Sequence, residues 1–123
     1  MREIKYRGLE RGGGWIYSDI NDLDFWIDVI RDRIIKETIT QFTGLKDKSG
    51  KEIYEGDVLS DIHDRTFEVC WQSGYEPEME VGFWLKKTYI NEIFPFHYTK
   101  DIKHLGMKVI GNIYDNPELF LKD

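Results

Sequence analysis

Apolar and polar residues alternate with a period of two at the start of the chain. In residues 2–9, Ile4 and Tyr6 occupy one face and charged residues the other, which predicts a strand with one face in water. Three consecutive glycines at 12–14 predict a turn, and the apolar residues 15–17 begin a second strand. The pattern therefore predicts an N-terminal β-hairpin.

Residues 25–39 fit two patterns. Ile27 and Ile30 stand at a spacing that a helix could use, whereas Phe25 and Ile27 alternate as in a strand. The many β-branched residues favour strands. We therefore expect strands here.

Two tight turns lie near the centre of the chain. Residues 46–51 combine Asp, Ser and Gly, and Gly50 can take the positive φ that lets a hairpin return. A second turn at 55–57 precedes an apolar run that begins at Val58. These turns predict a hairpin followed by the start of a further strand.

The rest of the chain has the pattern of short strands joined by polar turns. Residues 58–62 and 67–71 predict two strands joined by a turn at 63–65, with Phe67 and Trp71 on the same face. A polar loop at 72–80 and strands at 81–85, 89–94 and 108–114 follow.

Two prolines restrict the C-terminal part. Pro95 interrupts the aromatic run 94–98 and lacks the N–H that a central strand needs, so this run is an edge strand or an irregular loop. Asn116 and Pro117 are a favourable cap and first residue for a short helical turn at 118–121.

The composition indicates one soluble domain. A chain of 123 residues buries roughly two thirds of its unfolded surface. It has no apolar run of the ~18 residues that a membrane span needs and no signal peptide, so we expect a soluble, intracellular protein. Cys70 is the single cysteine, which excludes an intramolecular disulfide and suits a reducing cytoplasm.

The net charge of −6 disfavours nucleic-acid binding without excluding it. Non-specific binding to phosphate backbones depends on concentrated Lys and Arg. A local basic patch can still exist on an acidic protein.

Three motifs carry a resemblance to a known family. Residues 41–57 (QFTGLKDKSGKEIYEGD) closely resemble the signature of YopX-type proteins from bacteriophages and prophages. Residues 2–7 with 14–17 look like the opening strands of that family, and residues 109–119 look like its closing motif. The resemblance covers nearly the whole chain and is specific in the order of the motifs.

The resemblance implies an architecture but no activity. We expect a mainly β protein: an SH3-like β-barrel over residues 41–123, preceded by an N-terminal β segment over residues 1–40 and ending in a short C-terminal helical turn. Similarity to the family also favours a strand pair within 25–39, followed by a single turn at 36–40. The family supplies no established activity to carry over.

No motif for catalysis, cofactors or metals is present. The polar loop at 19–24 resembles the start of a calcium loop, but the required glycine and glutamate are missing at its sixth and twelfth positions. The glycines at 12–14 precede a strand, whereas a phosphate loop precedes a helix. We therefore expect no cofactor and no metal, and treat an enzyme as the third hypothesis only.

That third hypothesis would need a site assembled from His63, His97 and Cys70. In the strand pattern Cys70 faces the same way as Glu68, away from the apolar row, and its sequence neighbours supply no positive charge to lower its pKa. We interpret it as a structural cysteine.

Aromatic and basic residues between 83 and 98 are the best functional lead. SH3-like barrels often bind peptides or nucleic acid through aromatic surfaces, although a small barrel also needs aromatic rings to fill its core. The candidate binding residues are Trp84, Lys86, Lys87, Tyr89, Phe96 and Tyr98.

Because no catalytic motif is present, we expect a non-enzymatic protein, and the resemblance to the family implies an accessory protein of phage or prophage origin in the cytoplasm of a bacterial host. We expect it to act by binding a protein, either another protein or a second copy of itself, and not a membrane. The alternative is a nucleic-acid-binding protein. That alternative requires five lysines to converge on one face beside exposed rings: Lys86, Lys87, Lys100, Lys103 and Lys108.

Overall fold

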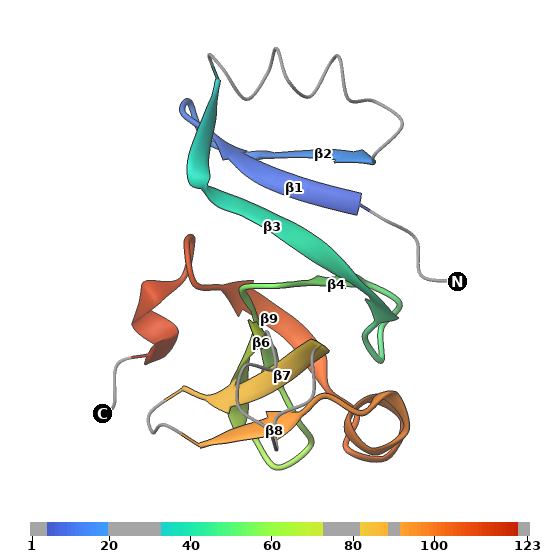
Figure 1. Ribbon diagram of the computed structural model, residues 1–123. Helices are drawn as coiled ribbons and strands as arrows, with labels where there is room; N and C mark the ends of the chain where they lie inside the picture. The colour runs from blue at the N-terminus through green and yellow to red at the C-terminus, as the bar shows by residue number, and fades with distance from the viewer. Residues whose placement is uncertain (1–4, 20–32, 73–81, 89–91, 121–123) are drawn as a thin grey trace. The chain divides into compact units, whose positions relative to one another are not determined.

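The computed structural model describes residues 5–19, 33–72, 82–88 and 92–120 (Figure 1). Its chain forms two compact units, Met1–Gly44 and Leu45–Asp123. Residues 41–44, which the sequence analysis assigned to the barrel, belong to the first unit. The described residues are mainly strands, as predicted.

The first unit contains the predicted N-terminal hairpin. Strands β1 (Lys5–Glu10) and β2 (Trp15–Asp19) pair antiparallel, with Lys5 opposite Asp19 and Leu9 opposite Trp15. Gly13 and Gly14 have φ values of 101° and 85° in the turn between them. The long strand β3 (Ile34–Lys46) pairs with the other edge of β1.

The turn expected at 36–40 is wrong, because these residues belong to β3. The register between β1 and β3 shifts there: Arg7 lies opposite Thr40, but Leu9 lies opposite Ile35. The Thr38 hydroxyl forms hydrogen bonds with backbone groups at this register shift. It donates to the carbonyl of Ile35 (2.6 Å) and accepts from the N–H of Leu9 (2.8 Å). The chain therefore continues through a bulge within a strand at this point. The expectations for residues 20–32, the calcium-like loop included, fall mainly outside the described residues.

The second unit begins with the predicted hairpin. β3 ends at Lys46, Gly50 has a φ of 89° in the turn, and the chain returns as β4 (Glu52–Tyr54). The second predicted turn is also present, with Gly56 at a φ of 89°.

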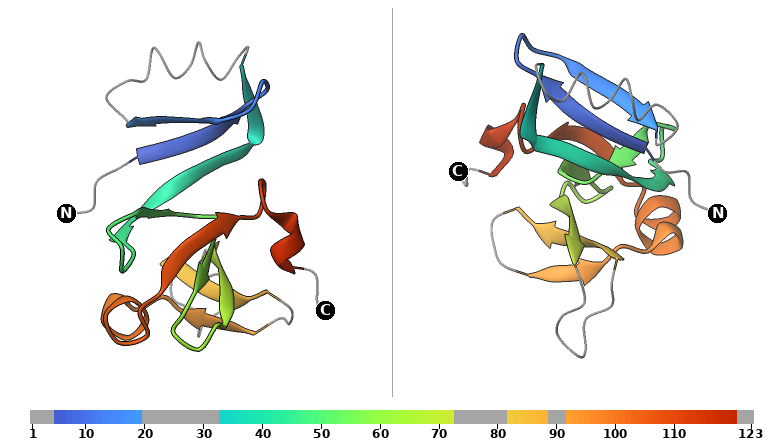
Figure 2. Two further views of the ribbon diagram at one scale, coloured as in Figure 1. Left: turned by 180° about the vertical axis from the view of Figure 1, so that it is seen from behind. Right: turned by 45° about the horizontal axis from the view of Figure 1, so that its top comes forward.

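A five-stranded antiparallel sheet follows, in the spatial order β8-β7-β6-β5-β9. It is strongly curled and forms the half-barrel expected of an SH3-like protein (Figure 2). Its strands are β5 (Asp57–Ser60), β6 (Thr66–Gln72), β7 (Gly82–Lys87), β8 (Ile93–Pro95) and β9 (Lys108–Asn112). β8 is an edge strand, which was one of the two possibilities predicted from Pro95.

Apolar side chains fill the concave face of this sheet. The register places Leu59 opposite Phe67, and Val69 opposite Leu85, so these four side chains share one face. All four are at most 6% exposed. Three further buried residues complete the cluster: Ile53, Ile102 and Met107.

A π-helix, η2 (Tyr98–His104), was not anticipated from the sequence. It follows β8 and contributes Ile102 to the core. The predicted C-terminal helical turn is present as a 3-10 helix, η3 (Pro117–Phe120). No helix among the described residues is long and apolar enough to cross a membrane.

Candidate functional site

A pocket of about 140 Å³ opens in the second unit between the concave face of the sheet, β8 and η2. Its apolar lining comes from four side chains: Phe67, Leu85, Leu105 and Met107. Its charged lining comes from Arg65, Lys87, Lys100 and Asp101, and Phe94 of β8 contributes an aromatic ring that is 37% exposed.

The volume restricts what the pocket can hold. Sites for drug-sized ligands and cofactors span about 300–1,000 Å³, whereas an engineered cavity of ~150 Å³ holds a single benzene molecule. A pocket of about 140 Å³ therefore suits one amino-acid side chain or a small anion, and is too small for a nucleotide.

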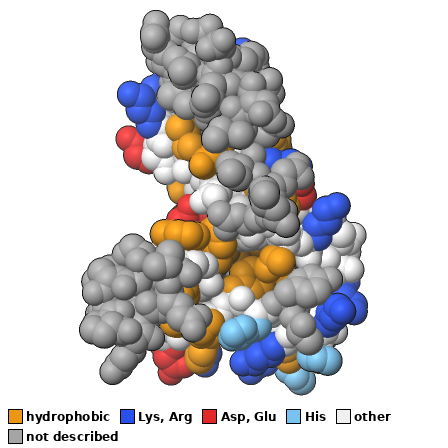
Figure 3. Space-filling view, turned by 45° about the vertical axis from the view of Figure 1, so that its right-hand side comes forward, with side chains coloured by type: hydrophobic (Ala, Val, Ile, Leu, Met, Phe, Trp, Pro, Cys, Tyr) orange, Lys and Arg blue, Asp and Glu red, His pale blue; other side chains and the backbone are white. Residues whose placement is uncertain are grey.

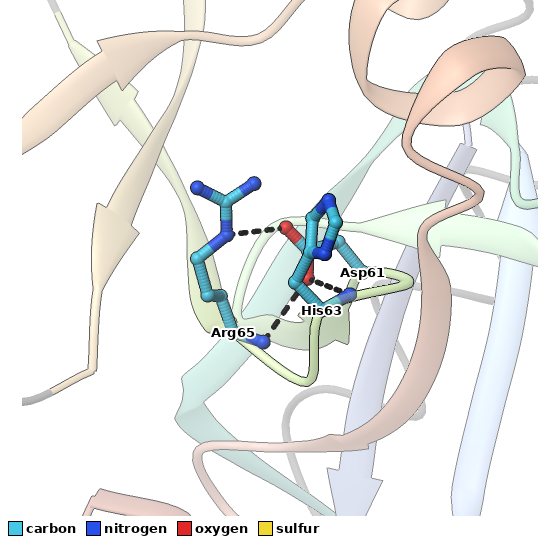
Figure 4. A network of polar contacts seen from close by, with 3 residues as sticks. All are labelled: Asp61, His63 and Arg65. Carbon is cyan, nitrogen blue, oxygen red and sulfur yellow. Dashed lines mark hydrogen bonds and ion pairs between the residues drawn. The ribbon is translucent and has the colours of Figure 1, made fainter.

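The β5–β6 turn holds Arg65 at the pocket (Figure 4). One carboxylate oxygen of Asp61 accepts the backbone N–H groups of His63 (2.9 Å) and Arg65 (3.0 Å), and the other accepts Nε of Arg65 at 2.8 Å. Figure 4 shows the two terminal guanidinium nitrogens pointing away from Asp61. Arg65 is thus anchored through Nε while its outer N–H groups face away from its anchor.

The Asp61 carboxylate is held in its charged form. Its side chain is completely buried, and burial alone would raise its pKa. The backbone N–H groups of Arg65 and His63, together with the Arg65 guanidinium, outweigh burial and lower the pKa of Asp61 below 3.8.

Lys87 reaches the pocket from β7. Its Nζ lies 5.7 Å from the ring centroid of Phe94 and 3.2 Å from the carboxylate of Glu92. The ion pair is largely exposed, so its own contribution to stability is small. Lys87 therefore has a defined position, although its ion pair with Glu92 holds it only weakly.

Asp101 and Lys100 come from the first turn of η2. The Asp101 carboxylate accepts the backbone N–H of His97 at 2.7 Å, which ties the start of η2 to its first turn. Burial raises the pKa of Asp101, although the His97 N–H and the charges of Lys100 and His97 act in the opposite direction. The pocket thus combines three cations with one buried carboxyl group.

The structure places the six candidate binding residues in different surroundings. Lys87 lines the pocket, and Phe96 packs against the core. Trp84 and Lys86 point to the opposite, convex face, because Trp84 pairs with Cys70 and Lys86 with Glu68. Tyr89 and the side chain of Tyr98 lie outside the described residues.

Eight of the nine residues that line the pocket were not among those six candidates, and Arg65, Phe94 and Lys100 are three of them. Lys100 was predicted only as one of the five lysines of the nucleic-acid alternative. Phe94 was noted only as part of the aromatic run 94–98. Arg65 had a visible signal, because Asp61 precedes it by four residues across a predicted turn, a spacing at which an Asp side chain can bond the turn's backbone N–H groups.

The five lysines of the nucleic-acid alternative do not share one face. Lys86 and Lys87 are consecutive in β7 and therefore point to opposite sides of the sheet. Lys86 lies opposite Glu68. Burial raises the pKa of Glu68, and the charge of Lys86 only partly opposes this rise. Lys87 and Lys100 line the pocket, and Lys103 and Lys108 are exposed.

Histidine side chains lie beside Lys and Arg side chains on the face shown in Figure 3. All three histidines of the sequence belong to the second unit, so this part of the surface does too. No group of three or more His, Cys, Asp or Glu side chains in the described ranges could hold a metal ion.

Cys70 is separated from the two histidines of the enzyme hypothesis. Its side chain lies on the convex face, and its Sγ contacts the carbonyl of Trp84 at 3.5 Å. His63 lies beyond the far end of β6, and the four residue steps from Thr66 to Cys70 span about 13 Å. His97 follows β8, with β7 between β8 and β6.

Comparison with known proteins identifies a family and finds similar solved structures. The family model described as "YopX protein" matches residues 2–121. The crystal structure of protein EF1440 from Enterococcus faecalis is similar with a TM-score of 0.51 and 25% sequence identity, over 97% of this chain and 76% of that chain. Among curated proteins, no sequence matches this chain.

Proposed function

We propose that this chain, which belongs to the YopX family, is a non-enzymatic module that binds a protein partner through the pocket of its second unit. The observation that carries the proposal is a pocket sized for one side chain, with an apolar floor and cations around it. The family resemblance further supports a role as a phage- or prophage-encoded accessory protein in the cytoplasm of the bacterial host.

The composition of the pocket supports a peptide over a nucleic acid. Phosphodiesters and sugars would gain little from the apolar floor formed by Phe67, Leu85 and Met107. An amino-acid side chain with an apolar stem would bury its carbon atoms there. The overall charge of −6 also opposes a polyanion.

Nucleic-acid binding is the second candidate function, favoured by one observation. Arg65, Lys87 and Lys100 surround the exposed ring of Phe94, which combines positive charge with a surface on which a base can stack. Binding of this kind would weaken steeply as the salt concentration rises.

A selection from a random peptide library, displayed on phage and panned on the purified protein, tests the first candidate. We expect selected peptides to bind L105W at least about tenfold more weakly than wild type, because the indole ring is larger than the leucine side chain and would enter the pocket. I110W is the matched control, because Ile110 is 45% exposed on β9 and does not line the pocket. Thermal unfolding checks that both variants are folded.

The outcomes separate the two candidates. Peptides that bind wild type and I110W alike, but L105W weakly, support the proposed function. Equal binding to L105W contradicts it. A mixed oligonucleotide pool that binds the protein at low salt only, with no peptide selected, favours the second candidate. Light scattering after size-exclusion chromatography shows whether a second copy of the chain is itself the partner.

A further inference from the structure

No described strand pairs with the outer edge of β8, so this edge can accept another strand. The N–H of Lys87 donates to the carbonyl of Glu92 (3.0 Å), and the N–H of Phe96 donates to the carbonyl of Phe83 (3.2 Å). Residues 92, 94 and 96 therefore bond toward β7, and alternate residues point their backbone groups the other way. Ile93 presents an N–H and a carbonyl at the outer edge, and Pro95 presents a carbonyl only.

This edge is short, which limits how it can be used. Short edge strands and proline are features that discourage indiscriminate pairing between sheets. One residue, Ile93, offers both a donor and an acceptor, so backbone pairing alone would bind weakly. A segment that pairs here needs a side chain that adds affinity and selects the register.

The pocket lies where such a side chain would point. In antiparallel pairs, residues directly opposite each other project to the same face. Leu85 and Phe94 are opposite each other, and both line the pocket. A residue placed opposite Phe94 on an added strand would therefore point toward the same pocket. Antiparallel addition continues the pattern of this sheet, in which each described pair is antiparallel.

The charges of the pocket select an acidic side chain. Three cations line it, against one carboxyl group, that of Asp101. A glutamate has a carboxylate for Arg65, Lys87 and Lys100 and two methylene groups for the apolar floor. An aspartate carboxylate is one methylene nearer to its own backbone and has a shorter apolar stem.

We propose that an extended segment of the partner pairs antiparallel with β8 and inserts a glutamate side chain into the pocket beside Phe94. This inference rests on the proposed function and adds the chemistry of the partner. It assigns Arg65, Lys87 and Lys100 to the carboxylate, and Ile93 to the partner's backbone.

The probe is the peptide acetyl-Thr-Val-Glu-Val-Thr-amide, compared with the same peptide carrying Gln in place of Glu. Binding is measured from the ¹⁵N–¹H NMR shifts of the protein. We expect the Glu peptide to shift the amides of Leu85, Lys87 and Ile93 and to bind about tenfold more tightly than the Gln peptide.

Two sets of variants test the charge and the strand separately. K87M removes a pocket cation and keeps an apolar stem, so we expect weaker binding of the Glu peptide only. K51M is its control, since Lys51 is exposed in the β3–β4 turn and does not line the pocket. N-methylation of both valines removes the N–H groups that would donate to the outward carbonyls of Ile93 and Pro95 and should abolish binding, whereas N-methylation of the glutamate should not.

The results distinguish this inference from the proposed function. Equal binding of the Glu and Gln peptides, or no effect of methylated valines, overturns the inference. If library-selected peptides bind in the pocket but none carries an acidic residue, the inference fails and the proposed function stands. If neither the selected peptides nor the Glu peptide binds, both fail.

Discussion

One carboxylate oxygen of Asp47 accepts a hydrogen bond from the backbone N–H of Val109 at 2.8 Å, although the two residues are 62 positions apart in the sequence. Its other oxygen accepts the N–H groups of Ser49 (2.8 Å) and Lys51 (2.9 Å) within the β3–β4 turn. Asp47 is only 6% exposed. One side chain therefore closes a hairpin turn and fastens it to the last strand of the half-barrel.

Replacing Asp47 tests this connection. D47A leaves three backbone N–H groups without their acceptor, and each buried, unsatisfied donor costs about 1–3 kcal/mol. Because water can reach part of the turn, we expect a total loss of about 3 kcal/mol in the free energy of unfolding, measured by urea denaturation. D47N keeps one acceptor oxygen and should lose less.

The control is K48A, an exposed residue of the same turn. It should change the free energy of unfolding by less than about 0.5 kcal/mol. A loss for K48A as large as that for D47A would show that the turn itself, and not the Asp47 carboxylate, is sensitive to substitution.

The strands and turns of the second unit were predictable because their signals are local. The φ values of Gly50 and Gly56 and the two-residue alternation of β6 each depend on a few neighbouring residues. The bulge in β3 could not be predicted, and the resemblance to the family implied a turn there. The hydrogen bonds of Thr38 to Ile35 and Leu9 allow the chain to continue as a strand.

The pocket could not be predicted in the same way, because its residues meet only through tertiary pairing. Lys87 and Phe94 come together through the β7–β8 register, and Arg65 joins them through the β5–β6 turn. η2 is held by the Asp101 carboxylate and by the burial of Ile102, in a segment without a long apolar period. The basic and aromatic residues between 83 and 98 indicated this region, but they did not indicate on which face of the sheet each side chain lies.

The pH dependence of stability should reveal the charged state of Asp61. Its pKa in the folded state is below the ordinary value of 3.8, so the folded state favours the ionised form. This contribution is fully present above the ordinary pKa and is lost as the pH falls through the lower, folded pKa. We expect D61N to be less stable by about 1–3 kcal/mol at pH 7.

The difference between wild type and D61N should therefore shrink on acidification, measured by urea denaturation from pH 7 toward pH 2.5. If this difference stays constant over the range, the charge of Asp61 does not contribute to the free energy of unfolding. D64N serves as the control, because Asp64 is exposed in the same turn.

Close packing in the first unit gives a prediction that does not involve the pocket. A Cβ atom added at Gly8 would lie 2.7 Å from Cγ2 of Ile34, which is completely buried. We expect G8A to lose about 1–3 kcal/mol, the usual cost of overpacking. A Cβ at Gly12 meets no atom within 4 Å, so G12A is the matched control and should be nearly neutral. Equal effects of the two substitutions on thermal unfolding would contradict the contact.

Asp101 should show the opposite dependence on pH from Asp61. Burial raises its pKa above 3.8 in the folded state, so its ionisation opposes folding as the pH rises from 3.8 through the folded pKa. D101N keeps an oxygen that can accept the His97 N–H and carries no charge. We expect it to be at least as stable as wild type at pH 7, and to lose any advantage near pH 3.

The same substitution should act on the pocket, because it removes the one negative charge among its lining residues. We expect D101N to bind the Glu peptide more tightly, by about threefold, with the Gln peptide nearly unaffected. D115N, an exposed position outside the pocket, controls for the change in net charge. Tighter binding in D115N as well would mean that the peptide responds to the charge of the whole protein and not to the carboxyl group beside the pocket.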